Sequence, residues 1–248
     1  MLFKETKKTK LPTIIILHGG GLSCWALTGI VELLHSDYHI VTPIIDGYGE
    51  DYAHDFMSIE DSAKKLTAYI EEQCNGRVYA LCGLSIGAQI VVEALTQNAD
   101  IAEFAVLESA LVLPVRGTKV LTVPTFKVFY GFIKMKWFAR LQAKTLYVPE
   151  AMFEQYFNDS IRISKQSLIN TALSNGTYTL KNDIEKTNAK VLILAGEKEI
   201  NLIKKSAKLL STKIPNNELS IMEKMGHGEL SMALPVEYVR RIKEFFAK

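Results

Sequence analysis

The run Gly83-Leu84-Ser85-Ile86-Gly87 holds a serine between two glycines, where the pattern of the sequence changes. An apolar, strand-like run, 78–82, precedes it, and a helix-like run, 88–97, follows it. A sharp strand-to-helix turn of this kind lifts a serine hydroxyl clear of the sheet, and glycines leave room beside it. The start of the helix also stabilises negative charge near the serine. The pattern therefore predicts Ser85 as a nucleophile.

Three further motifs add to this interpretation. An apolar run ends in the glycine cluster 18–21, and a second apolar run, 191–196, leads into a pair of glutamates. Near the C-terminus, residues 225–229 place His227 between two glycines. With its motifs in this order, the chain resembles the α/β-hydrolase family from about residue 13 to residue 246. The resemblance implies an oxyanion loop, a serine, an acid and a histidine, in that order along the chain.

The resemblance also assigns roles to the histidine and to one glutamate. It implies that His227 is the general base that activates Ser85. It implies that Glu199 is the acid that orients the imidazole, although the family usually has aspartate there. Glu197 is a competitor two residues away, and Glu108, at the end of an earlier strand, is another. Each of the three has a simpler alternative, a solvated surface carboxylate.

An oxyanion hole needs backbone N–H groups that point at the developing negative charge. We expect one from Ile86, the residue after the nucleophile, and one from the glycine cluster, with Gly20 as the candidate. His18 begins this cluster, and we expect it to shape the loop rather than to act as base. Trp25 follows and is predicted to line the substrate pocket, with packing in the core as the alternative.

The composition indicates a folded protein with a substantial core. The chain has 248 residues, of which 48% are hydrophobic and 23% charged, enough for one large α/β domain or two small ones. A net charge of +2 gives no general case for nucleic-acid binding. Three cysteines without paired spacing argue against a disulfide framework, and no Cys/His cluster has zinc-ligand spacing. We therefore expect no metal, and the proposed chemistry needs no organic cofactor.

The expected location is cytoplasmic. The apolar run after the basic N-terminal residues is too short for the core of a signal peptide. The sequence also has no uncharged apolar stretch of about 18 residues, the length that spans a bilayer.

Apolar, β-branched runs alternate with segments of helical periodicity, which predicts an α/β fold: a mostly parallel central sheet with helices on both faces. The core begins at a strand that resembles the third strand of the family, so the first two strands are expected to be absent. Ser58 is predicted to cap a helix, and Pro235 to open the last one. The expected strands are 13–17, 39–44, 78–82, 104–107, 190–194 and 218–222.

Residues 111–188 interrupt this alternation and are too long for a simple connection. They are rich in aromatic side chains and lie where the family carries a helical lid, so we interpret them as an inserted lid. Residues 1–110 and 189–248 then form the core. Phe129 and Trp137 are predicted to line the substrate pocket from this lid.

The lid carries a second pattern, which concerns charge. Between residues 109 and 149 there are seven basic residues and no acidic one. Five apolar residues fall on one predicted helical face, and a basic amphipathic helix can lie on an anionic membrane. The favoured alternative is a lid helix that packs its apolar face over the pocket, with its basic side facing solvent. The apolar face consists of Phe126, Phe129, Ile133, Trp137 and Leu141.

Together these patterns predict a serine hydrolase that cleaves a carboxylic ester with an apolar acyl or aryl group, through an acyl-enzyme. An acyltransferase or a thioesterase with the same residues is a rival, because the motifs do not encode the acyl acceptor. A non-catalytic ligand-binding protein on the same fold is a rival of another class, and a lipid-surface protein is a third. The expected partner is a small acyl substrate.

Overall fold

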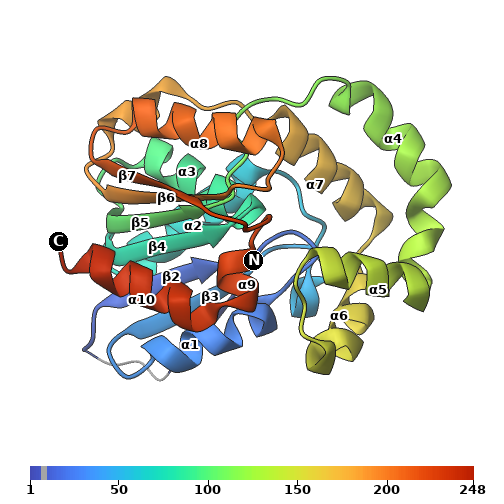
Figure 1. Cartoon of the computed structure of the whole chain (residues 1–248), viewed down its shortest axis with the longest axis horizontal. Coiled ribbons are helices and arrows are strands. Elements are labelled where there is room, and N and C mark those ends of the chain that lie inside the picture. Colours follow the sequence, from blue (N-terminus) through green and yellow to red (C-terminus); the bar gives the residue numbers. More distant parts are fainter. Residues whose placement is uncertain (7–9) are drawn as a thin grey trace.

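A parallel sheet between two layers of helices forms the body of the protein (Figure 1). The computed structural model describes residues 1–6 and 10–248. Within these residues the sheet has seven strands in the order β1-β3-β2-β4-β5-β6-β7, and β1 alone is antiparallel to its neighbour. The strands are β1 (Leu2–Glu5), β2 (Thr13–Leu17), β3 (His39–Ile44), β4 (Val78–Leu84), β5 (Ala102–Glu108), β6 (Lys190–Gly196) and β7 (Asn217–Met222).

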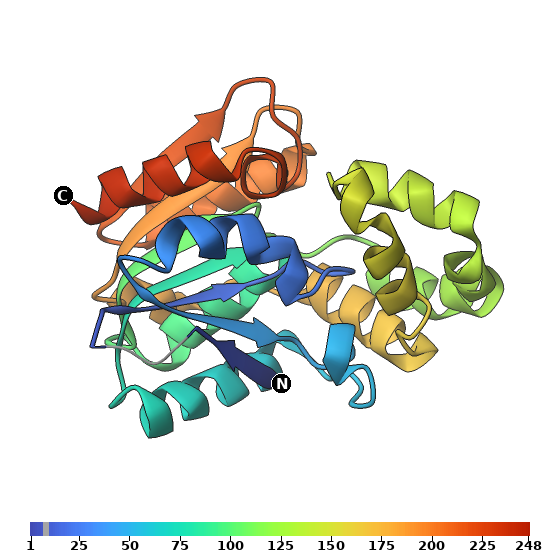
Figure 2. The same cartoon turned by 90° about the horizontal axis from the view of Figure 1, so that it is seen from below.

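Helices cover both faces of the sheet, and alternate strand residues belong to the two faces. On β2, Ile15 and Leu17 pack under one set of helices, whereas Ile14 and Ile16 pack under the other. Figure 2 shows a helix on either side of the N-terminal strands, blue above them and teal below. One layer consists of α2 (Ile59–Gln73), α3 (Ile86–Gln97) and α8 (Asn201–Lys213). The other consists of α1 (Thr28–Leu34), α9 (Glu229–Ala233) and α10 (Pro235–Phe246).

Most of the predicted elements are confirmed. The strands expected at 13–17 and 39–44 have these bounds, and the other four extend the expected ranges by one to three residues. Ser58 caps α2, because its hydroxyl accepts the Asp61 N–H at 3.1 Å. Pro235 opens α10, where its missing N–H costs no intrahelical bond.

The expectation that the core begins with the strand at residue 13 is wrong for the N-terminal edge. β1 adds an antiparallel strand there, with Leu2 opposite Ile44 in β3. Only two of its four residues are apolar, which gave little signal, since an edge strand needs few buried side chains. Phe3 supplies one packing contact, stacked on Tyr69 of α2 with ring centroids 3.8 Å apart.

A helical insertion separates β5 from β6 and lies beyond the carboxyl ends of the strands (Figures 1 and 2). The predicted single apolar face across 126–141 is wrong, because the helix does not continue. A 3-10 helix, Tyr130–Lys134, follows α4, and Met135 is extended before α5 begins. The helices of the insertion are α4 (Thr118–Phe129), α5 (Lys136–Thr145), α6 (Phe153–Ser160) and α7 (Lys165–Thr177).

In the described part of the chain, none of the helices combines the length and the apolar character that crossing a bilayer requires.

Candidate active site

Ser85 lies at the sharp turn between β4 and α3, with φ 54° and ψ −115°. A positive φ is unfavourable for a residue with a side chain, so the surrounding structure must hold it there. Its N–H donates to the carbonyl of Glu108 at 2.8 Å. A Cβ on Gly83 would lie 2.5 Å from the Gly87 backbone, and one on Gly87 would lie 2.6 Å from the His18 carbonyl. The two glycines therefore permit a turn that larger residues would block.

His227 lies on the loop between β7 and α9 and contacts both Ser85 and Glu199. Its Nε2 is 2.9 Å from Ser85 Oγ, and its Nδ1 is 2.8 Å from Glu199 Oε2. Because an ionised carboxylate can only accept, Nδ1 carries the proton and Nε2 is free to accept from the serine hydroxyl. The imidazole is 41% exposed, whereas the Glu199 side chain is fully buried. Residues 142 positions apart in sequence thus meet through one ring.

Glu199 is held by more than the histidine. Its second oxygen, Oε1, accepts the Ser109 hydroxyl at 2.7 Å and the Gly196 N–H at 2.9 Å. Three donors therefore surround a carboxylate that is closed to solvent, so protein groups replace its lost hydrogen bonds to water. The same contacts fix the orientation of Oε2 toward His227.

Ser109 is a residue of this site that the sequence reasoning missed. It follows β5 with φ 59°, and besides donating to Glu199 it accepts the Gly228 N–H at 3.2 Å. One hydroxyl thus joins the acid to the loop that carries His227. The available signal was weak: a small polar residue directly after a buried strand, next to the carboxyl end of β4.

The two alternative acids lie elsewhere. Glu197 accepts the Lys224 N–H at 2.8 Å, a contact that ties together two surface turns. Glu108 is buried beneath the site, where Oε1 accepts the Ser231 N–H at 3.3 Å and Oε2 has no hydrogen-bond partner. Burial raises the pKa of Glu108 to about 7, because desolvation disfavours the charged form. Of the three glutamates, Glu199 is the one in hydrogen-bond contact with His227.

Ile86 directly follows Ser85, and Gly20 lies close to the Ile86 side chain, so the predicted oxyanion hole of these two residues stays a prediction. Ile86 opens α3, and the first N–H groups of a helix have no intrahelical acceptor. A Cβ on Gly20 would stand 3.7 Å from the Ile86 side chain, so the loop of the glycine cluster passes close to the start of α3.

His18 anchors the glycine cluster and is fully buried. Its Nε2 accepts the Ile45 N–H at 3.1 Å, so Nδ1 carries the proton and donates to the Gly19 carbonyl at 2.8 Å. Burial lowers the pKa of His18 to about 4, which keeps the ring neutral. The residue therefore ties the loop of Gly20 to the end of β3, and its ring has no free nitrogen to act as a base.

A cavity of about 330 Å³ opens next to Gly20 and reaches into the insertion. Tyr48 from the core and Phe126, Ile133 and Leu146 from the insertion give it apolar walls. Thr171 and Asn175 of α7 add polar groups. The cavity thus combines an apolar lining with a few hydrogen-bonding groups, as ligand sites commonly do.

The three predicted pocket residues do not line this cavity. Phe129 and Trp137 are 55% and 59% exposed, whereas Phe126 and Ile133 line the cavity. Trp25 is 8% exposed and packs between core and insertion. The packing that was the alternative for Trp25 is therefore what the structure has.

Two side chains fasten the insertion to the loops of the site. The indole N–H of Trp25 donates to Asp159 of α6 at 2.8 Å, close to the glycine cluster. Tyr147, just after α5, places its hydroxyl against Gly226 and bonds to Glu229, on either side of His227. The insertion thus touches the glycine cluster and the histidine loop at once.

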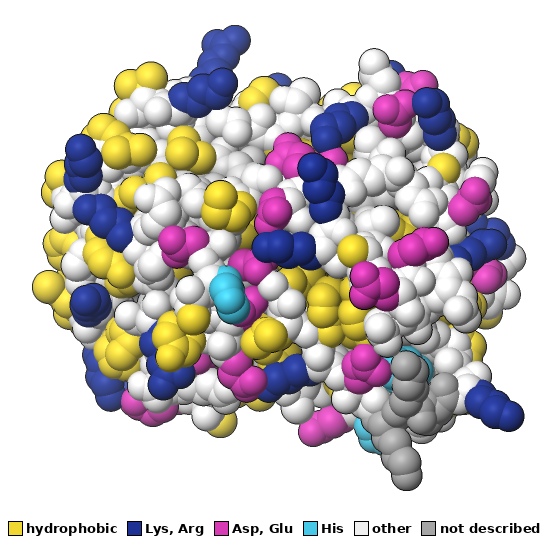
Figure 3. Space-filling view, turned by 180° about the vertical axis from the view of Figure 1, so that it is seen from behind, with side chains coloured by type: hydrophobic (Ala, Val, Ile, Leu, Met, Phe, Trp, Pro, Cys, Tyr) yellow, Lys and Arg dark blue, Asp and Glu magenta, His cyan; other side chains and the backbone are white. Residues whose placement is uncertain are grey.

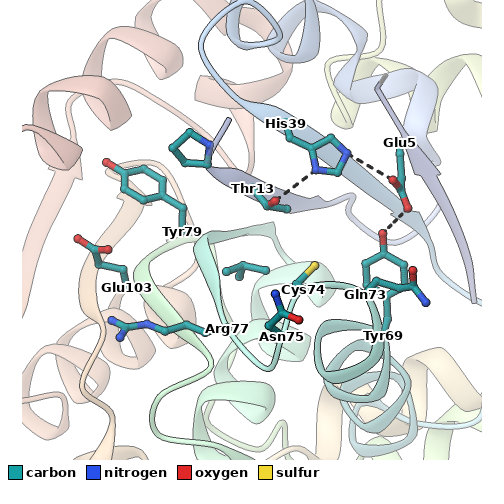
Figure 4. A pocket seen from close by; sticks show the side chains of 12 residues that line it. Glu5, Thr13, His39, Tyr69, Gln73, Cys74, Asn75, Arg77, Tyr79 and Glu103 are labelled. Carbon is teal, nitrogen blue, oxygen red and sulfur yellow. Dashed lines mark hydrogen bonds and ion pairs between the residues drawn. The ribbon is translucent and has the colours of Figure 1, made fainter. Parts of the chain in front are cut away.

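A second pocket, of about 500 Å³, lies at the opposite end of the sheet, where β2, β3 and β4 begin (Figure 4). Glu5 joins its walls: its carboxylate lies 3.3 Å from His39 Nε2 and accepts the Tyr69 hydroxyl at 2.5 Å. Ligands of open parallel sheets bind at the carboxyl ends of the strands, and this pocket is at the amino ends. It is remote from Ser85 and contributes nothing to that site.

A three-layer α/β structure with a serine, a histidine and a carboxylate in contact at the carboxyl edge of its sheet defines a class of proteins. The chain belongs to the alpha/beta hydrolase family, whose model matches residues 14–241. No curated protein matches the chain by sequence.

Solved structures with the same fold include enzymes of several kinds. A bromoperoxidase from Bacillus anthracis superposes with a TM-score of 0.81 at 18% identity, covering 99% of this chain and 95% of that one. An enol-lactonase from Burkholderia xenovorans has a TM-score of 0.81 at 14% identity, with 100% and 96% covered. An esterase from Exiguobacterium antarcticum has a TM-score of 0.81 at 16% identity, with 99% and 95% covered. At these identities the likeness shows the shared fold.

Burial of Glu108 predicts a specific dependence of stability on pH. Its pKa is raised from 4.5 to about 7, so the folded protein keeps a proton that the unfolded chain has lost. This carboxyl therefore lowers the free energy of unfolding as the pH rises from about 4.5 to about 7, and no further above that. Glu108→Gln has no proton to lose, so relative to wild type it should gain roughly 2–3 kcal/mol across that range.

Urea unfolding of both proteins near pH 5 and near pH 8 measures this difference. All other titrating groups are common to the two proteins and cancel in the comparison. If the free energies of unfolding of the two proteins differed by the same amount at both pH values, Glu108 would not be buried in its neutral form.

Proposed function

We propose that this protein is a serine hydrolase that cleaves carboxylic esters with an apolar acyl or aryl group, through an acyl-enzyme. The observation that carries the proposal is the continuous chain of contacts from Ser85 Oγ through His227 to Glu199, at 2.9 and 2.8 Å. A serine hydroxyl is a poor nucleophile unless a base removes its proton during attack, and this chain supplies that base.

In the proposed reaction, Ser85 Oγ attacks the ester carbonyl while its proton passes to His227 Nε2. Glu199 stabilises the imidazolium that forms and remains ionised itself. The N–H groups of Gly20 and Ile86 stabilise the negative charge on the former carbonyl oxygen. His227 then protonates the departing alcohol, leaving the acyl group on Ser85. Water, deprotonated by His227, then attacks the acyl carbonyl, and the acid leaves as His227 returns that proton to Ser85 Oγ.

The cavity beside Gly20 supports a substrate of modest size. Its volume of about 330 Å³ is at the small end of the range for ligand sites. Phe126, Ile133 and Leu146 favour an apolar acyl or aryl group there, and Thr171 and Asn175 offer hydrogen bonds to a polar substituent. A small or medium ester therefore fits better than a long-chain lipid lying wholly inside the cavity.

We propose further that residues 111–188 act as a lid over a core formed by 1–110 and 189–248. Helices of this segment supply most of the cavity lining, so a substrate in the cavity would lie between core and insertion. Closing such a segment excludes water and strengthens the electrostatic contacts around a reacting group.

Replacement of the nucleophile tests the proposal. Ser85→Ala should lower turnover of a p-nitrophenyl acyl ester by several orders of magnitude, because the attacking oxygen is gone. A fluorophosphonate probe should label the wild type and leave the variant unlabelled. His227→Ala should be about as inactive, since the two residues act as a unit.

Labelling that persists in a folded Ser85→Ala protein would refute the assignment of the nucleophile. A wild type that neither hydrolyses any ester in a panel of chain lengths nor reacts with the probe would support the ligand-binding alternative.

The acid is tested by a matched pair of glutamates two positions apart. Glu199→Gln keeps the size of the side chain but removes the charge opposite His227 Nδ1, and should slow the reaction by about two to four orders of magnitude. Glu197→Gln makes the same chemical change at the Lys224 N–H and should leave the rate nearly unchanged. Equal losses in both variants would mean that charge near the loop, rather than contact with His227, is what matters.

Ser109 is predicted to act through Glu199, as a positioning residue. Ser109→Ala removes the hydroxyl that holds Oε1 and also accepts from Gly228, so kcat should fall about tenfold while KM stays constant. Ser109→Gly is the control for the backbone, because glycine adopts the φ of 59° without strain. Both variants should lose kcat alike, and a loss confined to Ser109→Ala would assign the effect to the backbone instead.

A further inference from the structure

The outer surface of the insertion is unusually apolar. Of the seventeen large hydrophobic side chains that are exposed in the described residues, eight lie between residues 115 and 141. On α4, Val120 and Val128 are 74% and 69% exposed, and on α5, Trp137 and Leu141 are 59% and 57% exposed. Single exposed hydrophobic residues are ordinary, but a cluster of this density indicates a surface that another body covers.

Aromatic contacts join the two helices of this surface into one patch. The rings of Phe129 and Phe132 lie 5.7 Å apart, and those of Phe132 and Trp137 lie 6.1 Å apart. The exposed residues of α4 therefore continue across the 3-10 turn to those of α5. We call this surface the α4–α5 face, which comprises Val120, Leu121, Val128, Phe129, Trp137 and Leu141.

The α4–α5 face points away from the cavity and so cannot be the inner side of a lid. Phe126 and Ile133, which alternate with the exposed residues along the chain, already line the cavity. Ile133 is 9% exposed, whereas its neighbours Phe129 and Trp137 are more than half exposed. This segment is therefore apolar on two sides: one side lines the cavity, and the other is exposed to solvent.

Basic residues are interspersed along the segment that carries the α4–α5 face. Two of the seven basic residues between 109 and 149 pair with carboxylates: Lys136 with Glu154, and Arg140 with Glu150. The other five form no ion pair with a carboxylate in the described part of the chain, and Lys127 lies between Phe126 and Val128 on α4 itself. These five are Arg116, Lys119, Lys127, Lys134 and Lys144.

Figure 3 shows the insertion side of the molecule from behind, with yellow hydrophobic side chains and dark blue basic ones interspersed along it. This combination has a specific physical meaning. A bilayer surface offers apolar depth for Val, Leu, Phe and Trp, and anionic headgroups for Lys and Arg. A protein partner of ordinary composition would instead call for mixed charge around the apolar centre.

We propose that the α4–α5 face docks on the surface of an anionic lipid membrane. The apolar side chains enter the boundary between headgroups and acyl chains, and Lys127 and Lys134 lie among the headgroup phosphates. In this orientation Phe126 and Ile133 hold the cavity on the other side of the same helices, close to the bilayer. The docking rests on the surface alone and does not depend on the proposed reaction at Ser85.

Intrinsic fluorescence offers a direct measurement, because the chain has two tryptophans in opposite surroundings. Trp25 is 8% exposed and packs between core and insertion, whereas Trp137 is 59% exposed. With phosphatidylcholine vesicles that contain about 30% phosphatidylglycerol, the emission should shift to the blue, and Trp137→Phe should abolish the shift. Vesicles of phosphatidylcholine alone should give little change.

Vesicle flotation of charge variants tests the electrostatic part. Lys127→Glu combined with Lys134→Glu should weaken binding to the anionic vesicles about tenfold or more. Lys205→Glu combined with Lys208→Glu, which reverses two exposed charges on α8, is the matched control and should bind nearly as wild type. Hydrolysis of a soluble ester should be unchanged in both double variants, because none of the four lysines touches the site.

Three outcomes would overturn the proposal. If the wild-type protein did not float with the anionic vesicles at low salt, the α4–α5 face would not be a membrane-docking surface. Equal binding by the two double variants would place the contact elsewhere on the molecule. A concentration-dependent dimer that Trp137→Gln dissociates would show that a second copy of the chain covers the α4–α5 face instead.

Discussion

The site depends on one buried charge. Glu199 is closed to solvent, and an isolated carboxylate there would be strongly destabilising, so its position is fixed by the donors that compensate for lost water. Those donors come from three places: Ser109 after β5, Gly196 at the end of β6, and His227 on the loop after β7. Satisfying one carboxylate therefore draws three segments together. Because Glu199 is fixed in this way, its bond to Nδ1 holds His227 within reach of Ser85.

The sequence was most informative where a local constraint dictates the residue type. Gly83 and Gly87 are required by backbone atoms 2.5 and 2.6 Å from where a Cβ would stand, and such requirements leave a readable spacing around Ser85. Strands buried on both faces likewise produce continuous apolar runs, which is why β2 and β3 could be predicted to the residue. Ser109 has no such pattern, because its role arises only when β5, β6 and the histidine loop meet in space.

The structure of the insertion could not be predicted from its sequence pattern. Its apolar residues follow helical spacing over 126–141, and that spacing does not reveal that the chain bends at Met135 and sends neighbouring residues to different surroundings. Phe126 and Phe129 are one helical turn apart, yet one lines a cavity and the other is 55% exposed. Hydrophobic periodicity predicts that one face of a helix is apolar, but it does not predict what will cover that face.

The attachment of the insertion gives it a mechanical relation to the chemistry. Asp159 holds Trp25, next to the glycine cluster, while Tyr147 rests on Gly226 and Glu229, on either side of His227. The insertion is thus fastened to the strand-end loops on both flanks of Ser85. A displacement of the insertion that widened the cavity would strain the loop of the glycine cluster and the loop of His227 together. In the proposed lid movement, opening the cavity and loosening the contacts around Ser85 and His227 would therefore occur together.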